Sequence, residues 1–216
     1  DVVSQATQRF SEVRKEADVF LAKRIAKVLP SLSYRLSQEP DYVSHGGRVA
    51  VQSRLGTNDT TGSLGYGLTF DRIGMSGTPS SVFSKSMTVH AVDVGLTQVV
   101  GQRTLVRLVY TLKLQSGFLE KPYRFVPLFD AAGLAAAEND GVRLDLRTFD
   151  AYRLDTKPPE EVPDRRARHA LAARALTYLP ALRASLRLDY RLYLDSWGMA
   201  AHTVESALYK DLGDAF

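Results

Sequence analysis

The feature that most constrains this chain is a strict alternation of apolar and polar residues over long segments. Between Leu182 and Leu194, one set of alternate positions is leucine, alanine or tyrosine, while the other set carries Arg187, Asp189 and Arg191. A period of two residues is the pattern of a β-strand whose two faces meet different surroundings. The same pattern recurs at residues 31–37, 48–55, 63–71, 90–98 and 104–115. The sequence therefore predicts six clear strands.

Three further segments alternate less regularly and predict weaker strands, at residues 14–24, 169–178 and 203–212. In each of them the apolar set shifts by one residue. Either a β-bulge or a helical turn would explain such a shift.

The connections between these strands alternate in predicted length. Short ones fall near residues 25–30, 56–61, 100–103 and 179–182, and longer ones at 38–47, 72–88, 119–168 and 196–202. Short turns at one end and long loops at the other are typical of bacterial outer-membrane β-barrels. We therefore predict an all-β, antiparallel up-and-down transmembrane barrel, with about nine strands visible and residues 1–216 forming one domain.

The two faces of the predicted strands allow two interpretations. The apolar face could be the core of a soluble β-sandwich or a lipocalin-like binding module, with the charged face in water. The loop asymmetry instead favours an apolar face toward lipid and a polar interior, as in a porin-like channel or an envelope scaffold that binds a partner. A basic interior would favour small anionic solutes. The candidate residues lining this interior are Arg35, Arg48, Gln52, Arg54, Asp93, Arg107, Lys113, Arg187, Asp189 and Arg191.

Composition excludes several other classes of protein. The chain has no cysteine, which rules out a disulfide scaffold, a thiolate zinc site and a cysteine nucleophile. The formal net charge is only +4. The basic residues Arg165, Arg166 and Arg168 lie beside an acidic run and lack an aromatic stacking platform, so we expect no nucleic-acid partner.

No motif in the sequence predicts catalysis or metal binding. The four histidines, His45, His90, His169 and His202, have no short metal-ligand spacing. The segment 74–77 is one residue short of a Gly-x-Ser-x-Gly nucleophile turn. We expect no enzyme activity, cofactor or metal. A less favoured alternative is an outer-membrane enzyme whose polar residues Ser44, His45, Asp195 and His202 converge at the outer rim.

The segment 119–168 is the longest irregular stretch and is far longer than ordinary connections. Connections of this length usually carry a function or are disordered. It could fold into the interior as a constriction, cap the barrel, dock a protein partner at the outer loops, or remain a mobile surface loop.

Eight stretches together resemble an uncharacterised family of Gram-negative outer-membrane β-barrel proteins, known as a domain of unknown function. The resemblance implies an outer-membrane location and contact with outer-membrane lipid, but no activity or catalytic residues. Family members look longer, so we expect further strands upstream of Asp1 and beyond Gly213, and a larger, even-stranded barrel. The stretches are Asp1–Thr7, Ser37–Tyr42, Ser63–Gly67, Asp71–Gly74, Val94–Gln98, Pro122–Leu128, Arg168–Arg174 and Asp195–Thr203.

Overall fold

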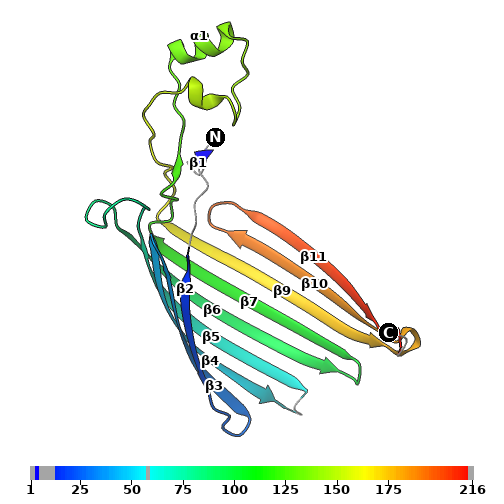
Figure 1. Cartoon of the computed structure of the whole chain (residues 1–216). Coiled ribbons are helices and arrows are strands. Elements are labelled where there is room, and N and C mark those ends of the chain that lie inside the picture. Colours follow the sequence, from blue (N-terminus) through cyan, green and yellow to red (C-terminus); the bar gives the residue numbers. More distant parts are fainter. Residues whose placement is uncertain (1–2, 5–12, 57–58, 214–216) are drawn as a thin grey trace.

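The computed structural model describes residues 3–4, 13–56 and 59–213, and its main feature is a single antiparallel meander of nine strands. Each strand pairs with the next along the chain, which confirms the all-β, up-and-down prediction. Figure 1 shows a strongly curved sheet whose edge strands, β2 and β11, do not meet, so the sheet is not a closed barrel. The strands are β2 (Lys15–Ala22), β3 (Val28–Glu39), β4 (Tyr42–Leu55), β5 (Thr60–Ile73), β6 (Lys85–Val100), β7 (Thr104–Gly117), β9 (Arg165–Leu179), β10 (Ala184–Asp195) and β11 (Ala200–Lys210).

The three weaker strands are present, as β2, β9 and β11, and they contain no bulge. The pairing of β9 with β7 runs without interruption from Arg165, opposite Ser116, to Thr177, opposite Thr104. The alternative of a bulge or helical turn in these segments is therefore wrong. Most strands are also longer than predicted, because backbone hydrogen bonds continue where the apolar pattern has ended.

The two ends of the sheet differ in their connections, but less regularly than predicted. Short turns close one end at residues 23–27, 56–59, 101–103 and 180–183. Thr57 and Asn58 of the second turn lie outside the described residues. At the opposite end, hereafter the loop end, residues 74–84 and 118–164 form long connections. The predicted long connections at 38–47 and 196–202 are wrong, because β3 and β4 are joined by Pro40 and Asp41 alone and β11 starts at Ala200.

The insertion, residues 118–164, is a small unit with secondary structure of its own. It contains β8 (Arg124–Phe125), the helix α1 (Ala131–Asn139) and the 3-10 helix η1 (Phe149–Ala151). The short strand β1 (Val3–Ser4) pairs with β8, whereas most of the resemblance stretch at residues 1–7 lies outside the described residues. In Figure 1 the insertion stands above the loop end of the sheet. Its predicted end is corrected, since residues 165–168 already belong to β9.

Almost nothing in the described part of the chain forms a hydrophobic core. The buried apolar residues there are Ile73, Phe125, Ala137 and Ala184, and no large side chain is fully buried. Both faces of the sheet are open. No helix among the described residues is long and apolar enough to cross a membrane.

Candidate functional site

All ten predicted interior residues lie on one face of the sheet, hereafter the polar face. The pairing shows this strand by strand: Arg35 is opposite Gly46, Asp93 is opposite Thr111, and Arg107 is opposite Arg174. Because directly opposed residues share a face, the arginines of β3 and β4 face the same side as those of β7 and β10. The register thus places residues that are up to 156 positions apart on one face of the sheet.

The best-defined contact on the polar face is a bidentate ion pair between Arg48 and Asp93. The Nη1 of Arg48 donates to Oδ1 of Asp93 at 2.8 Å, and its Nη2 donates to Oδ2. Arg48 belongs to β4 and Asp93 to β6, so the pair crosses the intervening strand at Gly65. A Cβ atom at Gly65 would overlap both charged groups. The absence of a side chain at Gly65 therefore allows the ion pair to lie directly on the sheet.

A second ion-pair network links three strands on the same face. Arg187 Nε lies 3.0 Å from Asp189 Oδ2, and its Nη2 contacts Glu205 on β11. Arg174 on β9 donates to both carboxylate oxygens of Asp189, from Nε to Oδ1 and from Nη2 to Oδ2. Arg174 and Glu205 were not among the predicted residues, because both lie in segments where the alternation looks irregular. Extending the register from β10 to its two neighbours would have found them.

The polar face carries cations that have no acidic partner. Arg54, Arg107, Lys113 and Arg191 have no carboxylate within 4.0 Å among the described residues. Arg107 lines a concavity of about 370 Å³ on this face. Its Arg107 guanidinium and its hydroxyl groups are hydrogen-bond donors, while Arg48 is paired with the Asp93 carboxylate that also lines it. The other polar residues lining it are Ser31, Arg48, Gln52, Ser63, Asp93 and Thr111, and Phe20 adds an aromatic ring.

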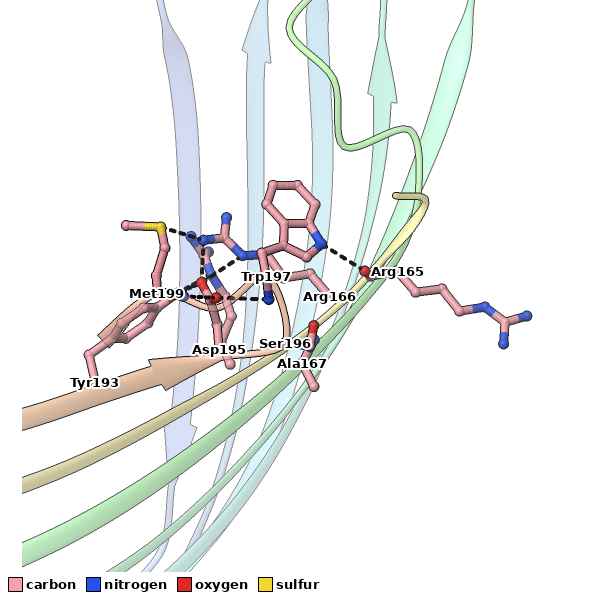
Figure 2. A network of polar contacts seen from close by, with 9 residues as sticks. Arg165, Arg166, Ala167, Tyr193, Asp195, Ser196, Trp197 and Met199 are labelled. Atoms are coloured by element: carbon pink, nitrogen blue, oxygen red, sulfur yellow. Dashed lines mark hydrogen bonds and ion pairs between the residues drawn. The ribbon is translucent and has the colours of Figure 1, made fainter. Parts of the chain in front are cut away.

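The turn between β10 and β11 is fixed by the buried carboxylate of Asp195 (Figure 2). Its Oδ2 accepts from Arg166 Nε at 3.0 Å and from the Tyr193 hydroxyl at 2.8 Å. Its Oδ1 accepts from the backbone N–H groups of Trp197 and Met199, each at 3.0 Å. Both oxygens are thus satisfied, which makes Asp195 a structural acceptor. Arg166 also stacks on the Trp197 ring at 4.2 Å.

The four polar residues that the enzyme hypothesis expected to converge are divided between the two faces of the sheet. Ser44, opposite Asp71, and Asp195, opposite Arg168, are on the polar face. His45 and His202 are on the other face of the sheet. No cluster of three or more metal-ligating side chains occurs in residues 3–4, 13–56 and 59–213.

The histidines instead form a repeated contact that the sequence analysis missed. Each one pairs with a tyrosine on the preceding strand, with its Nδ1 2.7 or 2.8 Å from the tyrosine hydroxyl. The tyrosines sit in the pattern Leu-x-Tyr-x-Leu, which occurs four times, at residues 32–36, 64–68, 108–112 and 188–192. That repeat was the available signal. The pairs are Tyr34–His45, Tyr66–His90, Tyr110–His169 and Tyr190–His202.

The insertion is attached to the rim and has its own polar contacts. Tyr123 donates to the Asp41 carboxylate and accepts from the Ser76 backbone N–H at 2.8 Å. Within the insertion, the backbone N–H of Arg147 donates to Asp145, and the hydroxyl and N–H of Thr148 donate to the same carboxylate. These hydrogen bonds hold the pKa of Asp145 below its usual range.

The comparison with known families matches residues 80–216 to the family described as "Protein of unknown function (DUF3570)". The chain belongs to this family. The match covers β6 to β11, the insertion and the Asp195 turn, and it confirms the resemblance to an uncharacterised family. The family description gives no location or activity. No curated protein and no solved structure matches the chain.

Proposed function

We propose that this sheet is the larger part of the wall of a β-barrel in a bacterial outer membrane, whose polar interior binds or passes small anionic solutes. The observation that carries the proposal is the uncovered apolar face. On that face Leu64, Leu108 and Leu188 are 52%, 45% and 47% exposed. Soluble monomers rarely expose apolar patches of more than a few hundred Å². Contact with membrane lipid would cover this apolar face.

The total surface supports the same environment. The chain exposes 15473 Å² at a mass of 23.9 kDa. A compact folded monomer of this mass exposes roughly 9,900 Å². A sheet that is open on both sides contributes to this excess, together with the protruding insertion (Figure 1). Within the nine-stranded sheet, the seven strands between β2 and β11 have 12 to 16 residues, which exceeds the length that a tilted strand needs to cross a bilayer.

The directions of the two edge strands limit how the proposed barrel could close. Nine antiparallel strands place β2 and β11 in the same direction, so pairing them directly would give a parallel seam. An all-antiparallel barrel therefore needs an odd number of additional strands between them. Further strands of a longer chain would supply these, which agrees with the even strand number of bacterial barrels.

The interior role follows from the unpaired cations of the polar face. Ion pairs such as Arg48–Asp93 neutralise part of the charge, whereas Arg107 and Arg191 remain without a carboxylate partner among the described residues. Rings or patches of unpaired charge select ions of the opposite sign in pores. The interior therefore favours anions.

Two measurements on the full-length protein test this function. Heat-dependent gel mobility of the detergent-extracted protein reports a closed barrel, and planar-bilayer conductance reports an open interior. We expect a mobility shift and anion-preferring conductance. The Arg107→Gln plus Arg191→Gln variant should lose part of the anion preference, while Arg72→Gln, a cation on the opposite face, should not. A protein that stays in solution without detergent would refute the membrane placement and favour a soluble binding module.

The insertion favours a second role as a docking site for a protein partner outside the membrane. It folds around Phe125, which is 4% exposed, and stands above the loop end of the sheet (Figure 1). The Val126 N–H donates to the Pro158 carbonyl at 2.9 Å, so a short linker can replace the residues between them. We expect a variant in which a short linker replaces the residues between Val126 and Pro158 to show unchanged conductance. Increased conductance would instead show that the insertion restricts the pore.

A further inference from the structure

The four Tyr–His pairs occupy equivalent positions in four successive hairpins. Each tyrosine lies six residues after the first residue of its strand, which is Val28, Thr60, Thr104 or Ala184. Each histidine lies two residues toward the loop end from the residue opposite its tyrosine. The hairpins are therefore copies of one structural unit, although their loops range from two residues to the whole insertion.

The pairs are staggered along the sheet by a constant amount. The row of directly opposed residues through Tyr66 passes through Val49 to Leu32, two residues before Tyr34. The row through Tyr110 likewise reaches Leu64, two residues before Tyr66. The same step of two residues per two strands separates the last two pairs.

This stagger corresponds to the tilt of strands in a barrel. With a rise of about 3.4 Å per residue and strands about 4.8 Å apart, the line through the pairs is inclined by about 35°. Barrel strands tilt by roughly 35–45° from the axis. The stagger therefore places all four Tyr–His pairs at one height on the wall of the proposed barrel.

A second polar ring lies at a fixed distance from the histidines on the same face. In each returning strand, the residue eight positions after the histidine is polar. At the tilt above, the two rings are about 22 Å apart along the axis. The outward residues between them are almost all apolar, and barrels carry an apolar band about 25 Å tall. The residues of the second ring are Ser53, Gln98, Thr177 and Lys210.

Each imidazole keeps its Nε2 without a hydrogen-bond partner among the described residues. In the tautomer in which the tyrosine hydroxyl donates to Nδ1, the ring proton is on Nε2 and is available to an acceptor outside the described part of the chain. All four rings are exposed. An unpaired donor inside hydrocarbon is strongly unfavourable, so an imidazole at the edge of the hydrocarbon needs an acceptor there.

We propose that the loop-side edge of the membrane hydrocarbon lies at this imidazole ring, where each histidine donates from Nε2 to an ester carbonyl of the surrounding lipid. The inference rests on the proposed barrel function. Four equivalent donors around a curved wall face different directions, and a protein partner would cover only one sector. A lipid leaflet presents acceptors at one height around the whole wall.

Spin-label depth measurements test this boundary. The chain has no cysteine, so Leu114→Cys and Leu194→Cys, each four residues beyond a tyrosine, can be labelled singly in the full-length protein in phosphatidylglycerol vesicles. We expect both labels to contact a water-soluble nickel chelate. Labels at Leu108→Cys and Leu188→Cys should instead contact oxygen, at equal depth.

The outcomes separate this inference from the proposed function. If labels at 114 and 194 lie as deep as those at 108 and 188, the hydrocarbon extends beyond the histidines and the inference is overturned. If all four labels contact the chelate, the protein does not span the bilayer, and the barrel proposal fails as well.

A change of lipid tests the hydrogen bond itself. Ether-linked lipids lack the ester carbonyl. The unfolding midpoint of the unmodified protein should fall on transfer from ester-linked to ether-linked vesicles. The quadruple variant His45→Phe, His90→Phe, His169→Phe and His202→Phe should show no such fall. Equal shifts in both proteins would overturn the imidazole–carbonyl contact.

Discussion

Replacing Gly65 with alanine tests how the polar face holds its central ion pair. The new Cβ would occupy the space where the Arg48 guanidinium meets the Asp93 carboxylate, and the pair would separate. Both groups are the ends of flexible side chains, so the expected cost is the loss of the ion pair rather than backbone strain. Arg48 is 41% exposed and Asp93 25%. A bidentate pair with that exposure contributes about 1 kcal/mol.

The matched control is Gly67→Ala, on the same strand and the same face. A Cβ there meets the Gly47 carbonyl oxygen at 3.7 Å, an ordinary contact. Alanine in place of glycine reduces the entropy of the unfolded chain and stabilises by about 0.5 kcal/mol. We therefore expect Gly67→Ala to be slightly stabilising and Gly65→Ala to be less stable than this control by about 1 kcal/mol.

The assay is urea unfolding in detergent micelles or vesicles, followed by the fluorescence of the single tryptophan, Trp197. Trp197 lies at the rim between β10 and β11, away from Gly65, so it reports unfolding of the whole sheet. In an Asp93→Ala background the two glycine substitutions should become equivalent. If Gly65→Ala is still less stable than Gly67→Ala in the Asp93→Ala background, the ion-pair explanation is refuted.

Three further substitutions probe the rim and the insertion. Arg166→Met removes the cation beside a fully buried carboxylate and should destabilise the β10–β11 turn by about 3 kcal/mol in urea unfolding, whereas Arg165→Met should have little effect. Gly133→Val places a side chain against the Tyr152 carbonyl, so the insertion should become sensitive to protease while heat-dependent gel mobility is unchanged. The pKa of Asp145 is lower in the folded insertion than in the unfolded chain, so the ionised carboxylate stabilises the folded insertion. This stabilisation is fully present above the pKa of an unfolded aspartate, about 3.9, and is lost as the pH falls through the pKa of the folded state. Protease protection of residues 143–149 should therefore decline below about pH 4, and Asp145→Asn should remove that pH dependence.

The sheet and its two faces could be predicted from the sequence, because side-chain alternation follows directly from strand geometry. The ten predicted interior residues share a face for the same reason. Arg174 and Glu205 were missed because their strands carry several alanines and one serine on the apolar face, which weakens the contrast between the faces. Turn lengths were also misjudged at residues 40–41, where polar strand ends look like loop.

The contacts between strands could not be predicted from alternation alone. The Arg48–Asp93 pair depends on a register that places Gly65 between them, and this register is visible only once β4, β5 and β6 are aligned. The Tyr–His pairs depend on a diagonal neighbour in the next strand. The internal order of the insertion, including the buried Phe125, comes from contacts among residues that have no periodic pattern.

The diagonal Tyr–His contact gives each hairpin a means of selecting its strand alignment during folding. A slip of one residue between two strands is opposed by the faces, since it would move every leucine to the polar side. A slip of two residues keeps each side chain on its correct face, so the hydrophobic effect alone does not oppose it. Such a slip would, however, separate Tyr190 from His202, and likewise the other three pairs. The four hairpins therefore each carry a local check on alignment that works independently of loop length.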